Sequence, residues 1–79
     1  MKITAYLLVR VTGENVSIKS YPTEKAARDV YLELYKEARE YYAPMGGFTV
    51  DMKNSRWLYN VLYHGQQIET TFVDSIDIE

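Results

Sequence analysis

The chain has 79 residues, of which 47% are hydrophobic and 25% are charged, and it carries a formal net charge of −2. Its length and composition predict one domain, residues 1–79, with a thin core, and exclude a disordered chain. The absence of cysteine excludes disulfide bonds, thiolate metal sites and thiol nucleophiles. The charge also excludes a broad basic surface, so that contact with nucleic acid would require a local patch.

The first apolar run, residues 3–9, follows a single lysine and is too short to span a bilayer. No small-residue cleavage site follows it, so a signal peptide is not expected. Folding by packing alone suits a reducing compartment. We therefore expect a cytoplasmic protein that makes no membrane contact.

Apolar and more polar residues alternate along residues 3–12, which predicts a first strand. The second face of this strand is partly apolar too, as expected near the middle of a sheet. Gly13 and Asn15 lie in the turn that follows, where both residue types readily adopt a positive φ. Residues 16–21 alternate again, so the two strands are expected to form a hairpin.

A long amphipathic helix is predicted over residues 23–42. Thr23 can cap the first free N–H groups, and Glu24 is favourable at the positive end of the helix dipole. Pro44 and Gly46-Gly47 end the helix. The apolar stripe expected to face the sheet comprises Ala27, Val30, Tyr31, Leu34, Ala38 and Tyr41.

Further strands are expected over residues 48–52, 56–63 and 68–78, separated by turns at 53–55 and 64–67. In the second of these strands, Trp57, Tyr59 and Tyr63 are expected to share one face. The order β-β-α-β-β-β predicts an α+β fold, with an antiparallel sheet of about five strands and the long helix on one face. The other face is expected to be solvated or to bind a partner.

The sequence has no pattern typical of an enzyme. Its only histidine, His64, lies in a predicted turn, and nothing resembles a nucleophile elbow. Gly46-Gly47 follows a helix, which is the wrong order for a phosphate cradle. The one dense acidic group lies at the chain end and lacks the spacing of a calcium loop; it comprises Asp74, Asp77 and Glu79. We therefore expect no catalytic residue, no metal and no cofactor.

Basic and aromatic residues are interleaved on the first two strands. Lys2, Tyr6, Arg10, Lys19 and Tyr21 fall on one face if the hairpin pairs as expected. Such residues on an open sheet face are typical of proteins that bind single-stranded nucleic acid. Aromatic residues are also common in sheets simply because they pack well there. Single-stranded nucleic-acid binding through Tyr6, Arg10, Lys19 and Tyr21 is therefore the alternative function.

The chain contains eight tyrosines, and tyrosine is enriched at protein interfaces. Most are expected to close the rim of a thin core, namely Tyr31, Tyr41 and at least one of Tyr59 and Tyr63.

A second surface is expected on the helix shoulder, which comprises Arg28, Leu32, Tyr35 and Arg39. On a helical projection Leu32 and Tyr35 lie off the core stripe, with the two arginines beside them. An exposed Leu–Tyr pair flanked by arginines is typical of an interface hot spot. The same arrangement could equally be arginine stems that cover scattered apolar residues.

In its short length, its lack of cysteine, its hairpin–helix–sheet plan and its tyrosine-rich, mildly acidic surface, the chain resembles small proteins encoded by bacteriophages and other mobile elements. Anti-CRISPR and other anti-defence inhibitors are among them. The resemblance implies a non-enzymatic inhibitor that binds a host protein stoichiometrically. A net charge of −2 fits DNA mimicry poorly and favours binding by shape. Homodimerisation through sheet edges or helix faces is a further expectation.

Overall fold

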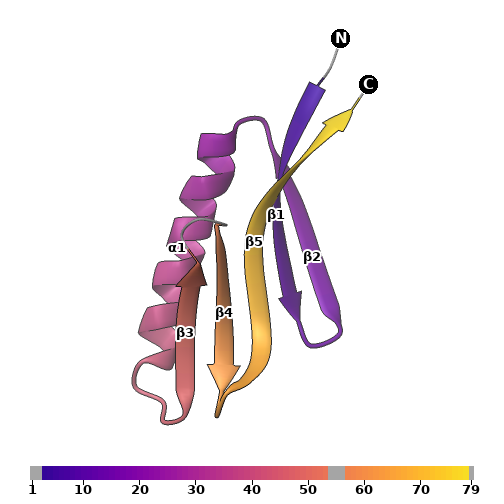
Figure 1. The fold of residues 1–79 in the computed structure, drawn as a ribbon. Coiled ribbons are helices and arrows are strands. Elements are labelled where there is room, and N and C mark those ends of the chain that lie inside the picture. Colours follow the sequence, from indigo (N-terminus) through magenta and orange to yellow (C-terminus); the bar gives the residue numbers. More distant parts are fainter. Residues whose placement is uncertain (1–2, 54–56, 79) are drawn as a thin grey trace.

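The computed structural model describes residues 3–53 and 57–78, and it shows one helix packed on one face of a five-stranded antiparallel sheet (Figure 1). The predicted fold class is confirmed. The elements are β1 Ile3–Thr12, β2 Asn15–Tyr21, α1 Glu24–Tyr42, β3 Phe48–Lys53, β4 Leu58–Tyr63 and β5 Gln66–Ile78. The predictions made for Lys2, for residues 54–56 and for Glu79 lie outside the described residues.

The strand order in the sheet is β2-β1-β5-β4-β3, so the first and last strands of the chain pair at its centre. Strands β1 and β2 form the predicted hairpin. Helix α1 connects the two edge strands, β2 and β3, and must therefore cross the whole sheet. Five strands spaced about 4.8 Å apart place the edges about 19 Å from each other. A helix of 19 residues is about 29 Å long and covers that distance.

The ends of α1 follow the predicted signals. The Thr23 hydroxyl accepts a hydrogen bond of 3.1 Å from the Ala26 N–H, and Glu24 lies in the first turn. The prediction for Tyr41 is wrong, because its side chain is 62% exposed. Tyr42 packs inward instead, 4.8 Å from Phe48 between ring centroids. It lies four residues after the buried Ala38 and therefore on the same face of the helix.

Aromatic rings fill the space between α1 and the sheet. Tyr31 is 1% exposed, and its ring centroid lies 5.6 Å from that of Trp57 and 5.7 Å from that of Tyr59. Tyr59 is fully buried, whereas Tyr63 is exposed, so the expectation that at least one of them closes the core is confirmed. Trp57 precedes β4 with a φ of +48°, although the sequence predicted it within the strand. Its ring nevertheless lies on the predicted face, against Tyr31.

The turn before β3 requires glycine at position 47. Gly47 has a φ of +86°, and a Cβ there would lie 2.7 Å from Cε1 of His64. The His64 backbone N–H also donates a 2.8 Å hydrogen bond to the Gly47 carbonyl oxygen, which fixes the two backbone segments beside each other.

Gly47→Ala is therefore expected to lower the free energy of unfolding by about 1–3 kcal/mol. Gly46→Ala is the matched control, because no atom lies within 4 Å of its Cβ and its φ is not in the strained range. Urea denaturation of both variants makes the comparison. Equal effects of the two substitutions would contradict this account of the turn.

Candidate functional site

The side of the sheet opposite α1 is the candidate functional surface. Directly paired residues of antiparallel strands point to the same face, so the register assigns every side chain. Leu8 pairs with Val73 and belongs to the core beneath α1. Val9, one residue later, pairs with Phe72 and Ile18 on the opposite side. Within residues 3–53 and 57–78 no element covers that side, which we call the open face (Figure 1).

The open face is mainly aliphatic. One row across four neighbouring strands is wholly apolar and comprises Ile18, Val9, Phe72 and Leu58. Five aliphatic residues are strongly exposed, and Ile18 of that row is one of them. Their exposed fractions are Ile3 60%, Val16 62%, Ile18 59%, Ile76 47% and Ile78 48%. The register places all five on the open face. Isolated exposed apolar residues are ordinary, but a contiguous set on one face marks a binding surface.

Polar groups of the open face lie mainly on β3, β4 and β5. The Thr70 hydroxyl donates a 2.7 Å hydrogen bond to Oδ1 of Asn60. On the edge strand β3, Lys53 Nζ lies 3.6 Å from Asp51 Oδ2. Asp74 lies on β5 between Phe72 and Ile76 and opposite Leu7, so it is outside the row of Ile18, Val9, Phe72 and Leu58. An apolar partner could therefore cover the central row without burying an unpaired charge.

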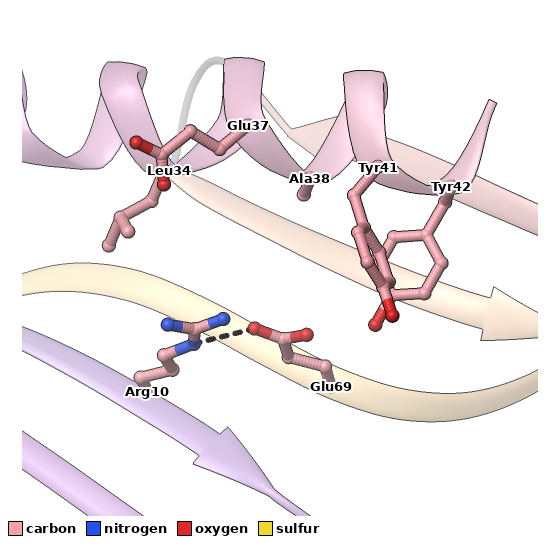
Figure 2. A pocket seen from close by; sticks show the side chains of 7 residues that line it. All are labelled: Arg10, Leu34, Glu37, Ala38, Tyr41, Tyr42 and Glu69. Atoms are coloured by element: carbon pink, nitrogen blue, oxygen red, sulfur yellow. Dashed lines mark hydrogen bonds and ion pairs between the residues drawn. The ribbon is translucent and has the colours of Figure 1, made fainter.

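A cavity of about 370 Å³ opens on the other side of the sheet, beneath the C-terminal half of α1 (Figure 2). At its base, Nε of Arg10 donates a 2.6 Å hydrogen bond to Oε1 of Glu69. Glu69 is only 4% exposed. Figure 2 shows the rings of Tyr41 and Tyr42 reaching from α1 toward the sheet.

Electrostatics in this cavity are dominated by the Arg10–Glu69 pair. Burial alone would lower the pKa of Arg10, but the hydrogen bond and charge of Glu69 outweigh it, so the pKa lies above its ordinary value. The pKa of Tyr42 is also raised, first by burial and then by the charge of Glu69. Arg10 therefore stays charged and Tyr42 stays protonated at neutral pH. The cavity therefore supplies a satisfied ion pair and two phenols, with no activated nucleophile.

Comparison with known proteins identifies no family. No family model, curated protein or solved structure matches this chain. In the part of the chain that the structure describes, no group of three His, Cys, Asp or Glu side chains is placed to hold a metal ion. No described helix is long and apolar enough to cross a membrane. Function must therefore be inferred from the surfaces themselves.

Two residues of the helix shoulder, Arg28 and Tyr35, pack against the aromatic core. Arg28 lies 4.4 Å above the Trp57 ring, measured from Cζ to the centroid, and its Nη1 is 2.7 Å from Oε1 of Glu24. Tyr35 was expected to be exposed but is half-buried, with its ring centroid 5.8 Å from that of Tyr59. The aromatic core is wide enough to reach round the helix, which the projection could not show.

Two shoulder residues remain at the surface. Leu32 is 43% exposed, and the guanidinium of Arg39 lies 5.7 Å from the ring centroid of Tyr35. A shallow pocket of about 400 Å³ adjoins Arg39. Leu32 thus offers one aliphatic side chain, where the open face offers a continuous row.

The residues predicted to bind nucleic acid do share a face. Tyr6 pairs with Tyr21, and Lys19 pairs with Leu8. That face is the one beneath α1, however, so their expected position on the open side of the sheet is wrong. Arg10 is also engaged by Glu69. The sequence missed this because the more apolar face of β1, which comprises Ile3, Ala5, Leu7, Val9 and Val11, is the one that the helix leaves uncovered.

Proposed function

We propose that this chain is a non-enzymatic protein-binding module and that the open face is its binding surface. One observation supports the proposal above all others. Five strongly exposed aliphatic side chains lie on one uncovered side of the sheet, with Val16 and Ile18 at the apolar row and Ile3, Ile76 and Ile78 at the far end of β1 and β5. Water contact with so many aliphatic groups is unfavourable, and burial against another protein removes it.

The chemistry of the open face favours protein over other ligands. Small molecules bind in concave sites with a few convergent polar groups, whereas this surface is a sheet face of aliphatic side chains. Single-stranded nucleic acid needs cations and stacking rings. Among the described residues of this face, Lys53 lies near Asp51 and Phe72 is the one aromatic residue. The nucleic-acid alternative is consequently less well supported than protein binding.

Within this class we propose the narrower role that the sequence resemblance implies, a stoichiometric inhibitor acting on a host or phage protein in the cytoplasm. The lack of cysteine and the small net negative charge support it. The helix shoulder is the second candidate surface, favoured by the exposure of Leu32.

A photo-crosslinking phenylalanine derivative placed in turn at Ile18, Ser17 or Leu32 tests the proposed surface in cells that express the chain. Ile18 lies on the open face, while Ser17 is exposed on the other face of the same strand and is the matched control. We expect a polypeptide adduct from position 18 and none from position 17. Adducts from Leu32 alone would move the surface to the helix shoulder. No adduct from any position would overturn the proposed function.

A further inference from the structure

We infer that the open face binds a second copy of this chain, so that two sheets pack face to face with the helices on the outside. The inference rests on the proposed function, because it identifies the partner of the same surface. Three features support it, namely the composition, the extent and the charge distribution of the open face.

Composition separates this face from the surfaces of transient complexes. The interfaces of transient complexes between different proteins are enriched in Tyr, Trp and Arg. Here the strongly exposed hydrophobic members of the open face are Val and Ile alone. The single tryptophan and the core tyrosines lie on the helix side. An aliphatic surface of this kind is typical of permanent subunit interfaces, which resemble a domain core cut in half.

The extent of the face reaches the lower end of the range for specific interfaces. Each strand residue occupies about 3.3 Å along the strand and about 4.8 Å across it, so the strands of this sheet present a face of about 650 Å². Specific interfaces bury about 600–1,000 Å² on each partner. The open face reaches that range when a partner covers all of it, including Asp74 and the Asp51–Lys53 pair, and a second copy of the same sheet is the partner whose size equals it.

Shape and charge also permit a symmetric contact. Two sheets that share one hand of twist pack face to face at about −30°, with their inner side chains interdigitated. A two-fold dimer places the same patch on both sides of the interface, so the patch must be complementary to itself. The central row of Ile18, Val9, Phe72 and Leu58 has no charge to repel its image. Lys53 continues this row on the edge strand β3, where its Nζ lies 3.6 Å from Asp51 Oδ2, and Asp74 lies two residues beyond Phe72 on β5.

Sedimentation equilibrium of the purified chain tests the inference. The native chain is expected to have twice its monomer mass of 9.2 kDa. Ile18→Lys places a charge in the central row and is expected to weaken dimerisation at least about 100-fold. Ser17→Lys adds the same charge one residue away on the other face and should leave the dimer intact.

Ile76→Lys with its control Ser75→Lys repeats the test at the far end of the face, in case Ile18→Lys does not fold. Circular dichroism of each variant verifies folding. A native chain of monomer mass at its highest soluble concentration would overturn the inference, as would a dimer that survives both open-face lysines. If that monomer still forms an adduct with a different polypeptide from position 18, the proposed function stands and only the second copy is rejected. Failure of both experiments rejects both.

Discussion

Tyr31→Ala is expected to lower the free energy of unfolding by about 3–5 kcal/mol, since it removes a large buried ring and leaves a cavity. Tyr31 is 1% exposed and joins the helix to the rings of Trp57 and Tyr59. A chain of 79 residues has a total stability of about 4–12 kcal/mol, so the variant will be partly or wholly unfolded. Urea denaturation followed by circular dichroism measures the loss. Tyr35→Ala, which removes a half-buried ring from the same helix, should cost about 1–2 kcal/mol.

The conservative variant Tyr31→Phe separates packing from the hydroxyl. That hydroxyl is buried and has no hydrogen-bond partner among the described residues, so its removal should be neutral or slightly stabilising. Burial raises the pKa of Tyr31 to about 12 from an ordinary value of 10.0. Between pH 10 and 12 the unfolded state loses the phenol proton while the folded state keeps it, which favours unfolding. The contribution of the protonated phenol to the free energy of unfolding is therefore complete below pH 10 and is lost between pH 10 and 12. Tyr31→Phe should show a shallower loss over that range, and an unchanged slope would contradict the assignment.

Arg10→Met is expected to destabilise the chain by about 2–4 kcal/mol, because it leaves the carboxylate of Glu69 buried without its partner. The Glu69 side chain is 5% exposed, whereas that of Arg10 is 46% exposed. Removing the other partner should therefore cost less. Glu69→Gln leaves a cation that still reaches water, so we expect a loss of about 1 kcal/mol.

The asymmetry between these two variants is the useful measurement, and chemical denaturation of each provides it. The double variant Arg10→Met/Glu69→Gln should recover part of the stability lost in Arg10→Met, because the stranded charge is gone. Equal losses in the two single variants would show that the pair is solvated, contrary to the burial of Glu69.

Much of the fold was predictable from local signals. Thr23 and Pro44 delimit the helix because capping and the missing proline N–H act within one turn. Alternation of apolar residues placed the strands to within a few positions, and α1 begins at Glu24 and ends at Tyr42, as expected. These features depend on neighbours in sequence, which is why they could be predicted.

Features that depend on distant contacts could not be predicted in the same way. The central pairing of β1 with β5 joins the two ends of the chain. Leu8 and Val9 are both buried, on opposite faces, so hydrophobicity could not decide which of them faces α1. The nucleic-acid residues were therefore assigned to the wrong side of the sheet. Tyr35 was misjudged because the helical projection contains no information on how far the aromatic core extends.

The candidate site illustrates the same limit. The sequence indicated a second, partly apolar face and a role for it in binding, but the residues selected were aromatic or basic. In the structure the interior rings of Tyr31, Tyr59 and Trp57 pack against one another, so they stabilise the core. The exposed hydrophobic side chains of the sheet are mainly branched aliphatic ones, such as Val16 and Ile18, that a thin core would ordinarily bury.

Solvent accessibility of methyl groups in the purified native chain, measured by NMR with a soluble paramagnetic agent, tests the central claim most directly. The monomer exposes Val16 by 62% and Ile76 by 47%, and Leu32 on the helix by 43%. If the open face is covered by protein, the methyl signals of Val16 and Ile76 will be protected while those of Leu32 broaden. In Ile18→Lys all three should broaden. Equal broadening of Val16, Ile76 and Leu32 in the native chain would contradict the account.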